Sequence, residues 1–406
     1  MPKSLYNSSS PDFLSGFAGF AIGLKPYLDS LGIGRVYFLL LALTIGAGLC
    51  ETWRSKSLNR SLLLFTILVS LSLTLWGTFS ISPYGLFEAG LIGLHYLTAL
   101  AFLKIFISYP RSARFFLVGY FLSVAFLASY ALYEPVYAGG RLTLEEEFNP
   151  SWFAAYLAAG TFTGAMVLSF VKSRMAQVIT LIIMAILCFS LVGTQGRNAL
   201  LAMVVSVAIW GFLGALLTSI YACHSFRLDE NFRNLMRHIL AFILAGSFIL
   251  GVVILGEKYQ LIQLHRIERL WSGDLAAATA GRTEIIAMYW DVILEGKVFS
   301  GFGGSEYVLE KIHGVRIAPH NLYLLLIVET AGTLLLLWMV LVYSLLYMSI
   351  KKNSALLFVL TVYLAVFSGG NDVLYYIYFW NFIFILVAWI GVLYSLPYRR
   401  ASRVLH

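Results

Sequence analysis

The chain has 406 residues, of which 60% are hydrophobic and only 12% are charged. About a quarter of the residues of a soluble globular domain are charged, so this composition excludes an ordinary soluble protein. The net charge of +8 does not indicate nucleic-acid binding. The basic residues lie in short segments between apolar runs, which is the pattern that sets membrane topology.

Apolar runs of about 18 residues or more recur along the whole chain, and each is long enough for a helix to cross the bilayer. These runs are too long and too continuously apolar for barrel strands, and lipid offers the backbone no hydrogen-bond partners. The first run has no small-residue cleavage site, so we expect it to be a retained span. We expect an all-α polytopic membrane protein of about 12 transmembrane helices, at residues 13–30, 35–50, 62–80, 86–107, 115–133, 151–171, 176–193, 198–217, 238–256, 320–348, 354–368 and 375–396.

An even number of spans places both termini on one side, and the basic residues indicate which side that is. Most of the 28 lysines and arginines fall in segments on the side of the termini. Short segments on the opposite side hold only Lys25, Arg35, Arg141 and Arg197. Because cytoplasmic loops are enriched in lysine and arginine, the sequence predicts that both termini are cytoplasmic.

The spans divide the chain into three parts. Residues 1–256 hold spans one to nine, and residues 320–406 hold the last three spans and a cytoplasmic tail. Between them, residues 257–319 form a large and mostly helical insertion on the extracytoplasmic side. Its first stretch, 258–271, is amphipathic and suited to a membrane surface, with Arg266 and Arg269 away from the apolar face.

The segment GTQGRN, residues 193–198, is a tight turn that leads into span eight. It places Arg197 at or just before the start of that helix, where free backbone N–H groups and the helix dipole favour an anion. The planar guanidinium suits phosphate oxygens, and Gln195 lies in the same turn. The alternative interpretation is an arginine that reaches up to the lipid headgroups.

A second arginine begins the second helix of the insertion. In the segment TAGRTE, Arg282 starts a helix that we expect to run to Glu295 and to end at Gly296. A glycine-rich stretch, residues 299–304, follows this helix and is a weak signal for close approach to a ligand. The alternative interpretation of Arg282 is an ordinary surface arginine.

The segment APHNLYLLLIVETAG, residues 318–332, begins span ten. Proline is typical of the first turn of a helix, so we expect His320 in that turn, with Tyr323 on the same face. Imidazole can act as a general base near neutral pH, although a lone histidine at a membrane interface is often structural. Glu329 follows about 900° of helical rotation later, so we expect it on the opposite face, the main charge at mid-depth in the spans.

The loop before span six holds Arg141, three consecutive glutamates at 145–147, and FNPSWFAAYL at 148–157. Carboxylates can bind a divalent ion, but such a run is more often a solvated surface. The sequence contains no HExxH motif and no short Asp-x-Asp pair. We therefore expect neither a metal nor another cofactor.

Taken together, these segments resemble the O-antigen ligase family, whose superfamily also contains O-antigen polymerases and bacterial protein O-oligosaccharyltransferases. The resemblance is carried by GTQGRN, by RTEIIAMYWDVILEGKVFSGFGG, by HNLYLLLIVETAG and by FNPSWFAAYL. It covers the topology of the whole chain and, at the level of motifs, roughly 60 residues. It implies a glycosyltransferase C-like membrane enzyme in the bacterial inner membrane, with its active site on the periplasmic face.

The resemblance also implies the substrates and the site residues. The donor is a glycan on undecaprenyl diphosphate, and the ligase acceptor is lipid A–core oligosaccharide. The motif arginines map to Arg197 and Arg282, which would neutralise the diphosphate, and the motif histidine maps to His320, which would act as general base. No carboxylate is placed as a nucleophile, so we expect one inverting, metal-independent displacement. The expected substrate-binding residues are Gln195, Arg266, Arg269, Asn321 and Tyr323.

Three other functions stay open at this point. A polymerase of the same superfamily would use a second lipid-linked repeat as acceptor, and a protein oligosaccharyltransferase would use a polypeptide. A lipid-linked glycan transporter is a function of a different class. It would need a charged pathway across the membrane, whereas the chemical motifs here lie on one side.

Overall fold

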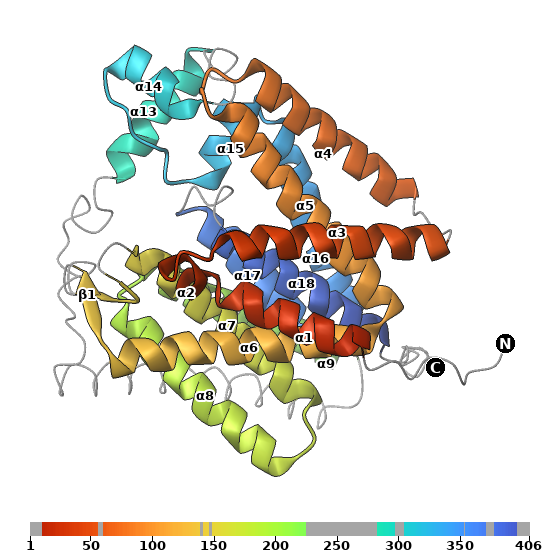
Figure 1. The fold of residues 1–406 in the computed structure, drawn as a ribbon. Coiled ribbons are helices and arrows are strands. Elements are labelled where there is room, and N and C mark those ends of the chain that lie inside the picture. Colours follow the sequence, from red (N-terminus) through yellow and green to blue (C-terminus); the bar gives the residue numbers. More distant parts are fainter. Residues whose placement is uncertain are drawn as a thin grey trace.

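The structure is a computed structural model, and it describes residues 10–55, 60–138, 141–145, 148–224, 282–296, 304–352, 354–370 and 377–395. Helices dominate it (Figure 1). Up to residue 224 they are α1 (Ser10–Gly23), α2 (Lys25–Ser30), α3 (Arg35–Ser55), α4 (Arg60–Phe79), α5 (Gly85–Ser108), α6 (Pro110–Tyr133), α7 (Pro150–Phe170), α8 (Arg174–Gly193) and α9 (Arg197–His224).

The remaining described helices follow the predicted insertion and the last spans. They are α13 (Arg282–Leu294), α14 (Ser305–His313), α15 (Leu322–Thr330), α16 (Thr333–Lys351), α17 (Ala355–Ser368) and α18 (Ile377–Ser395). Two short antiparallel strands interrupt the helical pattern, β1 (Val136–Ala138) and β2 (Arg141–Thr143), with Tyr137 opposite Leu142. This hairpin lies where the sequence predicts only a loop.

The described helices have the length and composition of membrane spans. Eight of them are at least 18 residues long and apolar enough to cross a bilayer, and three shorter apolar helices accompany them. The eight lie in α3, α4, α5, α6, α7, α8, α16 and α18. The prediction of an all-α polytopic membrane protein is confirmed, while the predicted span 238–256 lies outside the described residues.

Two predicted spans are broken rather than continuous. The first divides at Leu24 into α1 and α2, where Pro26 lies in the first turn of α2. The tenth divides at Ala331 and Gly332, which have φ angles of 48° and 79°. Two successive left-handed residues redirect the chain, so α15 is a short helix of nine residues that ends before α16 begins.

The large core of the molecule is a bundle in which α18 is buried along nearly its whole length against α5, α6, α7 and α17. Glycines bring α1 and α6 into backbone contact. A Cβ added to Gly19 would lie 2.1 Å from the carbonyl oxygen of Phe116, and one added to Gly119 would lie 2.0 Å from that of Gly16. Small residues of this kind let membrane helices pack closely.

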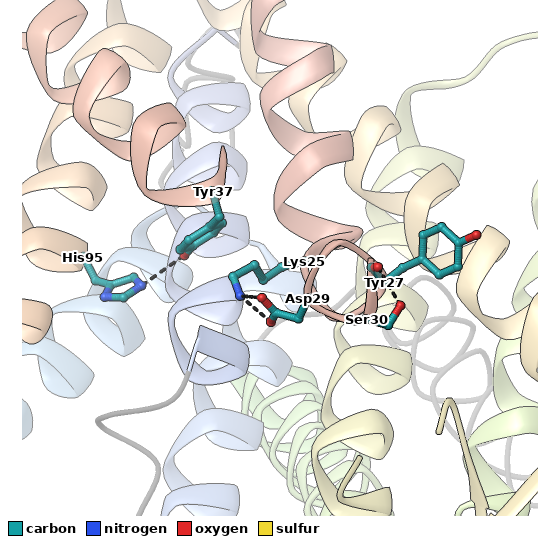
Figure 2. A network of polar contacts seen from close by, with 6 residues as sticks. All are labelled: Lys25, Tyr27, Asp29, Ser30, Tyr37 and His95. Atoms are coloured by element: carbon teal, nitrogen blue, oxygen red, sulfur yellow. Dashed lines mark hydrogen bonds and ion pairs between the residues drawn. The ribbon is translucent and has the colours of Figure 1, made fainter. Parts of the chain in front are cut away.

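A polar network lies inside this bundle, as Figure 2 shows. Lys25 is 6% exposed and forms an ion pair with Asp29. Beside it, Nε2 of the fully buried His95 and the hydroxyl of Tyr37 form a hydrogen bond of 3.0 Å. Lys25 is therefore a buried charge of the molecule in addition to Glu329, which is 4% exposed. The cost of burying Lys25 is offset by its carboxylate partner.

A second, smaller core joins α13, α14 and α15 at one end of the molecule (Figure 1). It contains Tyr289, Val292, Val308, Leu309, Leu324 and Val328. Other residues of α15, including Leu322 and Leu325, belong to the large core. The short helix α15 therefore packs on both cores and connects α13 and α14 to the bundle.

Candidate functional site

The turn between α8 and α9 has a fixed local geometry. Gln195 is 2% exposed and has a φ angle of 49°. The hydroxyl of Thr194 donates to the carbonyl oxygen of Leu191 at 2.6 Å and accepts the N–H of Gly196 at 3.2 Å. A Cβ on Gly196 would lie 2.3 Å from Cβ of Ala154 in α7. This closely packed turn makes Arg197 the first residue of α9, as predicted.

Arg141 is not among the residues that the sequence predicts for the site. It lies in β2 and binds this turn through its side chain. Its Nε donates to the carbonyl oxygen of Thr194 at 2.9 Å, and its Nη2 donates to Oγ of Ser151 at 2.9 Å. Ser151 lies in the first turn of α7, where the side chain of Asn149 caps the helix. The hairpin β1–β2 thus carries an arginine that ties the GTQGRN turn to the FNPSWFAAYL motif.

Arg282 begins α13, and this helix ends before Gly296 at φ 68°, close to the predicted bounds. Tyr289 of α13 is fully buried in the small core, and its hydroxyl donates to the carbonyl oxygen of Ile317 at 2.7 Å. Ile317 precedes His320 by three residues. Arg282 and the His320 segment therefore belong to one packed unit.

His320 does not lie in the first turn of a helix, which corrects the prediction. Its φ angle is 47°, and α15 begins two residues later at Leu322. The N-cap is Asn321, whose Oδ1 accepts the N–H groups of Tyr323 at 2.9 Å and Leu324 at 3.2 Å. Asparagine is among the strongest N-cap residues, and here it outweighs the helix-start signal of Pro319.

Residues of three separate motifs meet at the C-terminal end of α17. Asn198, next to Arg197, donates to the carbonyl oxygen of Phe367 at 3.0 Å. Asn321, next to His320, donates to that of Gly369 at 2.8 Å, and Arg282 donates to that of Gly370 at 2.9 Å. The hydroxyl of Tyr323 also donates to the carbonyl oxygen of Ala365 at 2.6 Å.

The end of a helix leaves carbonyl groups without intrahelical partners, and these side chains satisfy them. A Cβ on Gly370 would lie 2.4 Å from Oδ1 of Asn198, so a glycine is required for this close packing. The sequence reading had not included Gly369 or Gly370 in the site. Two glycines directly after an apolar span are a helix-end signal, but nothing local shows which side chains meet there.

A cavity of about 430 Å³ lies beside this meeting point, and Arg282 and His320 both line it. The volume is in the usual range of small-molecule sites. Its lining combines charged groups with aromatic rings, which suits a polar ligand with apolar faces. The other lining residues are Ser82, Tyr84, Glu88, Asn149, Ser151, Trp152, Gly304, Ser305, Glu306, Tyr307, Arg316, Ala318, Leu325, Glu329 and Tyr378.

The charges around the cavity are partly paired with one another. Nε of Arg316 lies 3.6 Å from a carboxylate oxygen of Glu306, and its guanidinium lies 4.1 Å from the ring centre of Tyr307. Trp152 and Tyr378 contact each other with ring centres 6.0 Å apart. Arg282 and His320 therefore share the cavity with aromatic surface and with carboxylates.

Glu329 also lines this cavity, which corrects the prediction that it faces away from His320. The rotation of about 900° assumed one continuous helix from residue 320, whereas the helix begins at Leu322. Glu329 lies one turn after Leu325, another lining residue, so the two share a face of α15. Its carboxylate is 4% exposed and accepts hydrogen bonds from Ser305.

Some residues that the sequence predicts for the site do not line the cavity or lie outside the described residues. Arg197 and Gln195 are not among the residues that line the cavity, although Asn198 joins their turn to the end of α17. Arg266 and Arg269 lie outside the described residues, as do the amphipathic stretch 258–271, most of the glycine-rich stretch 299–304, and residues 146–147. Within the described ranges, no group of three or more His, Cys, Asp or Glu side chains could hold a metal ion.

No protein-family model, curated protein or solved structure matches this chain. The resemblance of its motifs to the O-antigen ligase family therefore stays a prediction. Any functional assignment has to rest on the motifs themselves and on how the described residues are brought together.

Proposed function

We propose that this protein is an O-antigen ligase, a membrane glycosyltransferase that moves a glycan from undecaprenyl diphosphate to lipid A–core oligosaccharide. The observation that carries the proposal is the meeting of three motifs at the end of α17. Side chains of GTQGRN, of the α13 motif and of the HNLY motif bind the carbonyl groups of residues 367–370. These contacts bring segments that are far apart in the sequence to the end of one helix.

In the proposed reaction, the diphosphate leaves with the electron pair of its bond to the anomeric carbon. Arg282 and Arg197 neutralise the charge that develops on the diphosphate oxygens, because a guanidinium can bind two such oxygens at once. An acceptor hydroxyl attacks the opposite face of the same carbon and inverts it. His320 accepts the hydroxyl proton as general base.

The shared cavity supports this division of roles. It is lined by the proposed base and by one of the proposed diphosphate arginines, so both reacting ends would lie within reach of one sugar. Aromatic rings such as Trp152 offer apolar surface to a pyranose face, and carboxylates accept hydrogen bonds from its hydroxyl groups. The proposal places this cavity on the periplasmic face of the bacterial inner membrane, with both termini cytoplasmic.

The test is the product that the purified protein forms in lipid nanodiscs with lipid-linked glycan. A ligase produces glycosylated lipid A–core only when lipid A–core is added, and the carrier glycan is otherwise unchanged. Growth of the lipid-linked chain in the absence of lipid A–core would instead identify a polymerase. Labelling of an added acceptor polypeptide would identify a protein oligosaccharyltransferase.

A further inference from the structure

Glu329 is a buried carboxylate with an unusual partner. It lies in the last turn of α15, is 4% exposed, and receives two hydrogen bonds from one residue. Its Oε1 accepts the backbone N–H of Ser305 at 3.2 Å and the hydroxyl of Ser305 at 2.7 Å. Burying a carboxylate is costly unless it is hydrogen-bonded, and here the start of another helix supplies the bonds.

Ser305 is the first residue of α14, and the N-cap residue of that helix, Gly304, provides no side-chain cap. Glu329 therefore acts as an N-terminal cap supplied from a different helix. A carboxylate at this end is also favoured by the helix dipole. The same contact gives the N–H group of Ser305 a partner and offsets part of the cost of burying the carboxyl group.

This contact sets the position of one wall of the cavity. Ser305, Glu306 and Tyr307, in the first turn of α14, line it, as do Leu325 and Glu329 of α15. Apolar contacts in the small core also join these helices, but such contacts are non-directional. The directional bonds to Ser305 fix the register of α14 against the helix that follows His320.

We propose that Glu329 is a positioning residue of the transfer reaction. Through Ser305, its carboxylate holds the α14 wall in register with His320, so that an acceptor sugar lying against that wall presents its hydroxyl to the base. This inference rests on the proposed function for the reaction itself. The contact between Glu329 and Ser305 does not depend on that function.

The experiment uses the full chain in nanodiscs and compares Glu329→Leu, Ser305→Ala and the double variant. Leucine has no oxygen to accept the two bonds from Ser305, whereas Ser305→Ala removes only the hydroxyl bond. We expect Glu329→Leu to lower kcat/KM for the acceptor by about tenfold or more and Ser305→Ala to lower it less, with the donor KM within about twofold of wild type. The double variant should be no worse than Glu329→Leu, because residues that act through one contact are not additive. Ser305→Thr, which keeps a hydroxyl donor, should recover most of the loss.

The matched control is Ser123→Ala. Ser123 is also fully buried, and its hydroxyl donates to the carbonyl oxygen of Tyr120 within α6. Hydrogen exchange provides a readout besides activity. In Glu329→Leu, amides of residues 305–313 should exchange faster than in wild type, whereas Ser123→Ala should leave them unchanged.

Three results would overturn the proposal. Full activity of Glu329→Leu would remove any role in transfer. Loss of activity in Glu329→Leu, with full activity in Ser305→Ala and unchanged exchange of α14, would mean that Glu329 acts on the substrate itself. Absence of transfer by the wild-type protein with every acceptor, together with faster exchange in Glu329→Leu, would refute the proposed function and leave only a structural contact.

Discussion

Arg282 and Asn321 donate hydrogen bonds to the carbonyl oxygens of two consecutive residues at the end of α17. Arg282 binds that of Gly370 at 2.9 Å and Asn321 binds that of Gly369 at 2.8 Å. Adjacent acceptors on one backbone hold the two donors close together. The arginine that starts α13 and the segment that carries His320 are thereby held on a common support.

Replacing His320 tests the proposed base. His320→Ala should lower kcat for glycan transfer by on the order of 10²- to 10⁴-fold, the usual contribution of a general base, and should leave binding of the lipid-linked donor intact. The measurement is initial-rate transfer in nanodiscs, together with donor binding. His313→Ala is the matched control, because His313 ends α14 and does not line the cavity. Full transfer by a folded His320→Ala protein would remove the base assignment.

Replacing Arg282 by lysine tests the need for a guanidinium. Lysine keeps the charge but loses the planar fork, so transfer should fall by roughly 10²-fold, near the loss seen when one electrostatic donor is removed from an active site. Arg174→Lys is the control, since Arg174 also begins a helix and is exposed. If both variants retain wild-type transfer rates, Arg282 does not bind the diphosphate.

Asn321 caps α15 with its side-chain oxygen and donates from its side-chain nitrogen to the carbonyl oxygen of Gly369. Different substitutions distinguish these two contacts. Asn321→Ala removes the helix cap, at a cost of about 1 kcal/mol, and also leaves the carbonyl of Gly369 without its donor. Asn321→Asp keeps the cap but places a carboxylate against that carbonyl oxygen. We therefore expect Asn321→Asp to lose transfer activity as Asn321→Ala does. Thermal unfolding and transfer rates measured on both variants decide this, and an active Asn321→Asp would argue against it.

Gly196 tests the packing of the turn before Arg197. Gly196→Ala adds a Cβ that would lie 2.3 Å from Cβ of Ala154, and such overpacking costs about 1–3 kcal/mol. We expect a lower melting temperature and impaired transfer. Gly46→Ala is the control, because nothing lies within 4 Å of its added Cβ in α3. Equal melting temperatures for the two variants would contradict the observed packing.

Features with local causes could be predicted from the sequence. Apolar length predicted the membrane class, and the starts of α9 and α13 follow from the glycine-rich turn before Arg197 and from the turn before Arg282. The same kind of argument was wrong at His320, because Pro319 and Asn321 are competing helix-start signals only two residues apart. Gly332 is a local signal for the break after α15, but the apolar residues on both sides of it predict one continuous helix.

Features that depend on distant partners could not be predicted in this way. Neither Glu329 nor Ser305 carries any sign in the sequence that they meet across 24 residues. The same holds for Arg141 and Thr194, which are 53 residues apart. Packing of the whole bundle decides which donor binds each carbonyl group at the end of α17. Local sequence therefore indicates candidate residues, whereas the contacts that position them depend on the folded chain.

The two hydrophobic cores have a consequence for which substitutions the protein can accept. Arg282 and the His320 segment are tied to the small core, while Arg197 begins a helix of the large one. Substitutions that reshape the wall formed by α14 can accumulate in the small core without repacking the bundle around α18. Under the proposed function, substitutions in this wall would change acceptor preference and leave the bundle that receives the carrier lipid unchanged.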